Sequence, residues 1–168
     1  MILEQTLLQF GLDSGISGFM NSAWGWPIVE SLHFSGLSLL AGTIALFDLR
    51  LLGAFKSVSH RGMQQLIPLG VAGFALNVLT GTMFLVTAPD QYLYNPAFLS
   101  KIVLIFLAGL NVTAFYRFCY PGQENPDQYP RRAIILAGLS LVIWCSVIVA
   151  GRLITWFRPP YHWCLLCS

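Results

Sequence analysis

Charged residues are scarce in this sequence. Nine basic and seven acidic residues make up only 10% of its 168 residues, whereas in soluble globular domains about a quarter of the residues are charged. An ordinary soluble protein is therefore excluded. The net charge of +2 is too small to indicate a nucleic-acid partner. With 56% hydrophobic residues and a mean hydropathy of +0.68, the chain is predicted to be an integral membrane protein in contact with a lipid bilayer.

The motifs of common enzyme classes are also missing. The sequence has no Walker or Rossmann fingerprint and no arrangement that predicts a hydrolytic triad. Met1 to Met20 lacks the basic region and the cleavage site of a signal peptide, so we expect this segment to be retained. Catalysis by this chain alone is not expected.

Four apolar stretches are each long enough to cross a bilayer, for which about 20 residues suffice. Their approximate bounds are residues 27–52, 66–86, 97–118 and 132–157. The predicted fold is therefore all-α, a single membrane domain over 1–168 built as an integral membrane four-helix bundle. Glycines in the second stretch predict close packing against a neighbouring helix.

The first 22 residues predict a further helix, outside the membrane spans. Leu3, Leu7 and Phe10 recur at helical spacing among polar residues, a pattern typical of an amphipathic helix on a membrane surface. A lid over the bundle and a docking surface for a partner are the alternatives. Three glycines in the segment argue against one unbroken helix.

Basic residues predict the orientation of the bundle. Six of the nine lie in or beside the first and third loops: Arg50, Lys56, Arg61, Arg117, Arg131 and Arg132. The positive-inside rule then places both termini outside the cytoplasm. We expect a multi-pass protein of the bacterial inner membrane, with both termini and the tail 158–168 in the periplasm.

Ionisable residues inside the spans predict the functional region, because a charge in hydrocarbon is costly and by default faces other helices or a cavity. At a rise of about 1.5 Å per residue, one depth near the outer surface is reached from all four helices. This outer polar layer consists of Glu30, His33, Met83, Lys101 and Arg152. Opposite charges at one depth predict that Glu30 pairs with Lys101 or Arg152.

An inner layer is predicted in the same way. Asp48 lies near the cytoplasmic end of the first span, where Arg117 or Arg131 could pair with it. Both layers can also be structural clamps that fix the helix register, without any ligand.

Haem b is the first cofactor that the outer layer suggests. His33 would be an axial ligand, because helix bundles commonly build cofactor sites from facing helices. Met83 lies at a suitable depth for the second ligand, and His162 could reach the iron if the tail folds back. The lack of a second intramembrane histidine argues against a bis-histidine haem within this chain, so a partner ligand or five-coordinate iron are the alternatives.

Quinone and copper are the alternative ligands. In a quinone site, His33 and Glu30 would accept protons while Lys101 or Arg152 orients a carbonyl. Copper would suit His33, Met83 and the cysteines of the tail as ligand types, although their spacing matches no familiar site.

The tail carries a CxxC motif, Cys164 and Cys167, with His162 just before it. Ser168 stands where a c-type haem motif requires histidine, which excludes that site. Three interpretations stay open: a disulfide favoured by an oxidising compartment, a metal site with His162 and both thiols, and an inert tail.

The segments ESLHFSG, DLRLLG, NPAFLSK and AGR carry a resemblance. From Trp24 to Trp156 the chain resembles an uncharacterised bacterial family of small four-helix inner-membrane proteins, without an established activity to transfer. More distantly, its architecture is similar to cytochrome b561-like and copper-resistance D-type membrane proteins, in which intramembrane histidines bind haem or are thought to handle copper. The resemblance marks these residues: Glu30, His33, Asp48, Arg50, Lys101 and Arg152.

The leading functional hypothesis is a small electron-transfer subunit that binds haem b or quinone through the outer polar layer, beside a membrane or periplasmic protein partner. The alternatives are a non-catalytic accessory subunit of a larger complex and a copper-handling membrane protein.

Overall fold

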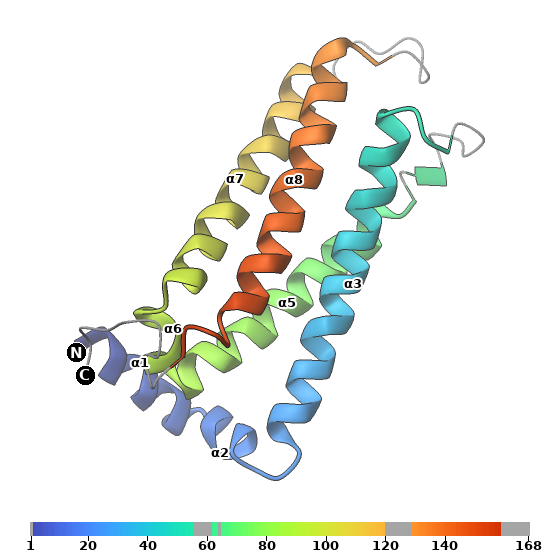
Figure 1. Cartoon of the computed structure of the whole chain (residues 1–168). Coiled ribbons are helices and arrows are strands. Elements are labelled where there is room, and N and C mark those ends of the chain that lie inside the picture. The colour runs from blue at the N-terminus through green and yellow to red at the C-terminus, as the bar shows by residue number, and fades with distance from the viewer. Residues whose placement is uncertain (1, 56–61, 64, 120–128, 159–168) are drawn as a thin grey trace.

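The computed structural model describes residues 2–55, 62–63, 65–119 and 129–158, and all regular elements within these ranges are helices. Figure 1 shows their arrangement. The helices are α1 (Ile2–Asp13), α2 (Ile16–Met20), α3 (Gly25–Leu51), α5 (Ile67–Thr87), α6 (Pro89–Leu93), α7 (Pro96–Phe118) and α8 (Arg131–Leu153). The prediction of an all-α fold is confirmed.

Four of these helices, α3, α5, α7 and α8, are long and apolar enough to cross a membrane, which indicates a multi-pass membrane protein. The predicted spans agree with them to within two residues except at the end of the chain. There α8 ends at Leu153, four residues earlier than predicted, and a turn follows.

The early end of α8 is explained by Asn95, which is only 2% exposed. Its side-chain oxygen accepts from the backbone N–H groups of Ala97 and Phe98 and thereby caps the first turn of α7. Its side-chain amide donates to the carbonyl of Ile154 at 3.0 Å. One buried amide therefore joins the beginning of α7 to the end of α8.

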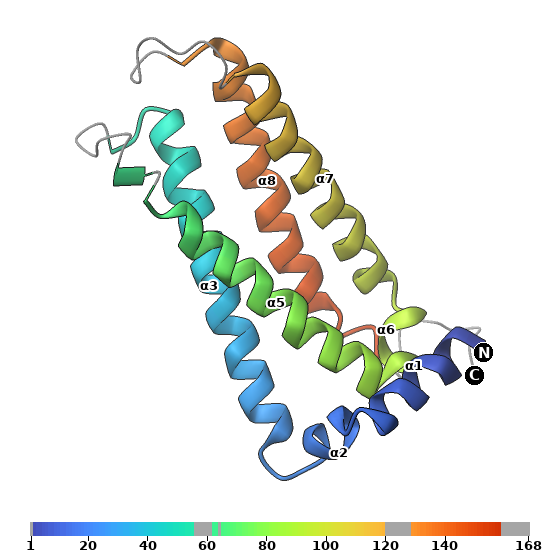
Figure 2. The same ribbon diagram turned by 180° about the vertical axis from the view of Figure 1, so that it is seen from behind.

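The four long helices form two closely packed pairs, α3 with α5 and α7 with α8, and the pairs meet where α3 contacts α8. α5 and α7 do not pack against each other to a comparable extent, and they lie apart on the side seen in Figure 2. We call the end that carries α1, α2 and α6 the α1 end, and the opposite end the far end. The bundle is therefore closed on one side and open between α5 and α7.

Two glycines bring the backbones of α3 and α5 into contact. A Cβ atom added at Gly73 would lie 2.6 Å from the carbonyl oxygen of Gly36 and 2.8 Å from the backbone nitrogen of Leu40. The side-chain amide of Asn77, one turn along α5, donates to the Gly73 carbonyl at 2.9 Å. Any larger residue would push the helices apart, as the glycines in this stretch predicted.

The N-terminal segment forms two short helices rather than one. Gly15 has a φ of 76°, in the left-handed region that glycine tolerates, and it separates α1 from α2. Both helices pack across the α1 end against α5, and Met20 at the end of α2 is completely buried. A Cβ atom at Gly11 would lie 2.6 Å from the Val86 carbonyl oxygen, so α1 touches the α5 backbone directly.

The contact between α3 and α5 leads to a prediction about stability. Gly73→Ala should lower the free energy of unfolding in detergent by about 1–3 kcal/mol, because the added methyl group meets rigid backbone atoms. Gly42→Ala, on α3, is the matched control because no atom lies within 4 Å of its new Cβ. It should stabilise by up to about 1 kcal/mol through helix propensity. Equal effects of the two substitutions would contradict a tight crossing at Gly73.

Candidate ligand sites within the bundle

His33 is held by a hydrogen bond between helices. Its Nδ1 atom on α3 lies 2.7 Å from the hydroxyl oxygen of Thr80 on α5. The same hydroxyl lies 2.7 Å from the carbonyl of Leu76 and donates its single proton there. The Thr80 oxygen therefore accepts a hydrogen bond from the Nδ1–H group of His33. In this tautomer of the neutral histidine, the Nε2 atom carries a free lone pair. The Nε2 atom can therefore accept a hydrogen bond or bind a metal through this lone pair.

Aromatic rings form one wall beside this histidine. The Phe84 ring meets the His33 ring edge to face, with centroids 5.6 Å apart. Phe84 also stacks on Trp26, at 5.2 Å. Gly81 leaves space on the same side, because a Cβ atom there would approach His33 only to 3.8 Å. The imidazole is therefore half-buried between α3 and α5, in the half of the bundle nearest α1.

Lys101 is the charged neighbour of His33. It is half-buried on α7, and its charge acts on the His33 ring. Its side chain lies beside Gly151 of α8, where an added Cβ would be 3.5 Å from the ammonium nitrogen. Met83 is half-buried on α5, three residues after Thr80 and so adjacent to it on the same face of that helix. Of the outer polar layer, the structure thus brings Lys101 close to His33.

Glu30 does not make the predicted ion pair with Lys101 or Arg152 in the described part of the chain. Both Glu30 and Arg152 are exposed, so neither charge needs a protein partner to offset burial. The charge of Glu30 acts instead on Tyr92 of α6. The prediction of a charge pair across this layer is wrong.

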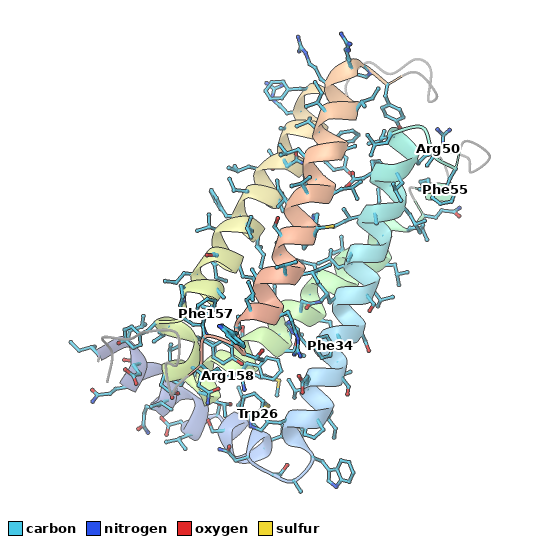
Figure 3. The ribbon with its side chains drawn as sticks, viewed as in Figure 1. Trp26, Phe34, Arg50, Phe55, Phe157 and Arg158 are labelled. Carbon is cyan, nitrogen blue, oxygen red and sulfur yellow. The ribbon has the colours of Figure 1, made fainter. Side chains whose placement is uncertain are left out.

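Arg158 occupies the α1 end near Trp26 and Phe157, as Figure 3 shows. Burial raises the pKa of the Tyr92 hydroxyl, although a hydrogen bond from the Arg158 guanidinium opposes this rise. The predicted ligands of the tail, His162, Cys164 and Cys167, lie outside the described residues, so the interpretations of the CxxC motif stay predictions. Within the described ranges, no three His, Cys, Asp or Glu side chains gather as a metal site.

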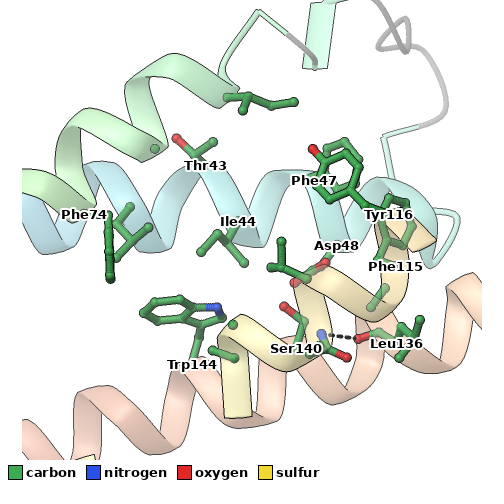
Figure 4. A pocket seen from close by; sticks show the side chains of 18 of the residues that line it. Thr43, Ile44, Phe47, Asp48, Phe74, Phe115, Tyr116, Leu136, Ser140 and Trp144 are labelled. Atoms are coloured by element: carbon green, nitrogen blue, oxygen red, sulfur yellow. Dashed lines mark hydrogen bonds between the residues drawn. The ribbon is translucent and has the colours of Figure 1, made fainter. Parts of the chain in front are cut away.

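A cavity of about 400 Å³ lies in the half of the bundle nearest the far end, among all four long helices. Figure 4 shows it at close range. Most of its walls are apolar, with aromatic side chains from all four long helices: Phe47, Phe74, Phe115, Tyr116 and Trp144. Val71 of α5 and Val112 of α7 line it and are also 61% and 44% exposed. The cavity therefore opens sideways from the bundle, between α5 and α7.

Asp48 lies in this cavity and is only 6% exposed. The Ser140 hydroxyl hydrogen-bonds to its carboxylate, but the Oδ2 atom has no partner in the described structure. The predicted ion pair with Arg117 or Arg131 is wrong, because both arginines are exposed at the far end while Asp48 points inward. A buried acidic side chain thus faces an apolar cavity without a basic partner.

Two further polar side chains in the cavity are incompletely satisfied. Asn111 of α7 donates to the Leu136 carbonyl at 3.2 Å, while its own oxygen has no partner. The indole N–H of Trp144 on α8 also lacks a hydrogen-bond partner in the described structure. Both side chains are at least nine-tenths buried, at 8% and 9% exposed. Buried polar groups are usually hydrogen-bonded, so these atoms lining the cavity keep an unused capacity for hydrogen bonds.

The sequence predicts Asp48 as a polar residue of the inner layer, but it does not predict the cavity and the polar side chains that surround it. Asn111 and Ser140 each stand as polar residues within a long apolar stretch, and such residues mark function by default. Their convergence with Asp48 depends on the rotation of three helices, which spacing along the chain does not give. Comparison with family models, curated proteins and solved structures finds no match to this chain. Its function must therefore be inferred from the chemistry of these sites.

A double substitution tests whether Glu30 and Arg152 interact. Glu30→Gln and Arg152→Leu should each change the free energy of unfolding by about 0.5 kcal/mol or less, because both side chains are exposed. Their effects should add to within about 0.5 kcal/mol in thermal unfolding of the detergent-solubilised protein. His33→Phe combined with Thr80→Val serves as the positive control, since that pair shares a hydrogen bond. A coupling free energy clearly above about 0.5 kcal/mol between Glu30 and Arg152 would instead support the predicted ion pair.

Proposed function

We propose that this chain is a small membrane subunit of an electron-transfer complex and that it binds a quinone beside His33. The observation that carries the proposal is the hydrogen bond from His33 to Thr80, which leaves the Nε2 lone pair free at a half-buried position near Lys101. A hydrogen-bond acceptor beside a cationic donor is the combination that a quinone head group requires in its reduced and oxidised forms.

Each group has a distinct role in this proposal. The Nε2 atom accepts a hydrogen bond from a quinol hydroxyl and can take up one of the two protons that the quinol loses on oxidation, while the second proton passes to water at the membrane surface. The Lys101 ammonium donates to a carbonyl oxygen of the oxidised ring. The stacked rings of Phe84 and Trp26 provide apolar neighbours for that ring beside His33. The two electrons of the quinol would pass to a redox centre in a partner protein.

Haem b is a second candidate because of the same lone pair. An axial histidine binds haem iron through a nitrogen lone pair while its other ring nitrogen donates a hydrogen bond, as His33 does to Thr80. Met83 is the second ligand that the sequence predicts, and a partner subunit is the other possible source. The optical spectrum of the purified protein distinguishes a haem from a quinone.

We further propose a location in the bacterial inner membrane with both termini in the periplasm. Arg117, Arg131 and Arg132 are all exposed at the far end, and the positive-inside rule assigns that end to the cytoplasm. The His33 site would then lie in the outer half of the membrane.

The quinone proposal predicts the effect of removing His33. In the protein purified gently with its companion chains, His33→Ala should weaken binding of a short-chain quinone about tenfold or more, since a hydrogen bond involving a chargeable group is lost. Lys101→Met should weaken it similarly. Ser38→Ala, exposed on the same helix, is the matched control and should bind normally.

Three results separate the hypotheses. A Soret band with stoichiometric iron that disappears in His33→Ala would favour haem b. Copper in the purified protein would favour the copper hypothesis. A colourless, metal-free protein whose quinone binding is unchanged in His33→Ala would rule out the proposal and favour an accessory subunit.

A further inference from the structure

We infer that the cavity around Asp48 is a separate binding site for a lipid-soluble primary amine in its protonated form. This site lies in the opposite half of the bundle from His33, and it does not depend on the quinone proposal. The inference rests on the uncompensated carboxylate, the aromatic walls, the unpaired hydrogen-bonding atoms and the lateral opening.

The carboxylate of Asp48 is the first element of the site. It is buried, its Oδ2 atom is unpaired, and its hydrogen-bond partner Ser140 is neutral. Arg117 and Arg131 are exposed, and Arg50, two residues further along α3, points to a different side of that helix. A buried carboxylate is stabilised when a cation lies against it with good hydrogen-bond geometry. The described part of the chain does not provide that cation, so a ligand can.

Aromatic rings favour a cation at the same place. Figure 4 shows Asp48 and Ser140 close together, with Trp144 on one side and Phe47 and Phe115 on the other. Phe47 and Phe115 pack edge to face at 5.7 Å, which fixes both rings beside the carboxylate. The face of an aromatic ring attracts an organic cation, and the attraction grows when water is excluded. A metal ion would lack the further oxygen ligands it needs, whereas an organic cation gains from these rings.

The unpaired atoms specify the kind of cation. Two of them are acceptors, Oδ2 of Asp48 and the side-chain oxygen of Asn111. A primary ammonium group has three N–H donors and no acceptor, so it can donate to both. A quaternary ammonium group has no N–H and would leave them unpaired. The indole N–H of Trp144 is the remaining unpaired atom, and a hydroxyl group next to the amine would accept from it.

The opening of the cavity specifies the rest of the ligand. Access is between α5 and α7, past exposed apolar residues such as Val71 and Val112. Because this side of the bundle faces the hydrocarbon of a bilayer, the ligand must carry an apolar body and partition into lipid. A volume of about 400 Å³ admits a compact hydrocarbon group together with the amine.

The test compares two probes that differ only in charge and hydrogen bonding. We would measure binding of radiolabelled 1-adamantylamine, which is protonated at neutral pH, to the full chain in lipid nanodiscs. The neutral 1-adamantanol has the same hydrocarbon cage and serves as the competitor. We expect saturable binding of the amine and at least tenfold weaker competition by the alcohol, because only the amine forms charge-assisted hydrogen bonds to Asp48.

Matched variants complete the test. Asp48→Asn keeps the shape of the side chain and should weaken amine binding about 10- to 100-fold. Glu30→Gln removes an acid from the exposed side of the same helix and should leave binding unchanged. Equal binding of amine and alcohol, or full binding by a folded Asp48→Asn variant, would overturn the inference. If that variant does not fold, the competition between the two probes on the wild-type protein decides alone.

Discussion

The contact between Gly36 and Gly73 determines where the other features of the bundle lie. On α3, His33 precedes this contact and Asp48 follows it by three turns; on α5, Thr80 and Phe84 lie on the His33 side and Gly70 on the Asp48 side. Direct backbone contact leaves no cavity at the crossing itself. The bundle therefore holds two chemically different polar regions, one in each half, instead of one continuous polar channel.

The two regions differ in how their polar atoms are satisfied. Around His33, the histidine, Thr80 and Asn77 are tied by hydrogen bonds to neighbouring helices or to their own backbone. Around Asp48, the Oδ2 atom, the side-chain oxygen of Asn111 and the indole N–H of Trp144 are buried without partners in the described structure. In a medium without water, unpaired groups of this kind are costly. The first arrangement leaves the Nε2 lone pair of His33 free, whereas the second leaves buried hydrogen-bonding atoms without partners in the described structure.

The sequence predicted the helices well and the side-chain pairs poorly. The four spans follow from hydropathy and length alone, because a membrane admits few other structures. Depth along each helix also follows from the rise per residue, which predicts Lys101 at the level of His33, and the charge of Lys101 does act on the His33 ring. Rotation about each helix axis is a different quantity, which depends on close contacts such as those of Gly36 and Gly73. Without the rotation, spacing predicts an ion pair for Glu30, whose side chain is in fact exposed, and it does not predict that Asp48, Ser140 and Asn111 converge.

The buried side chain of Asn95 has a mechanical consequence. Because it links the start of α7 to the end of α8, these two helices are clamped at the α1 end, in addition to packing along their length. The glycine contact clamps α3 to α5 in the same way. The bundle thus consists of two separately fastened helix pairs that meet at the interface of α3 with α8. Because the short helix α6 joins α5 to α7 at the α1 end, these two helices are tied together there and lie apart only toward the far end.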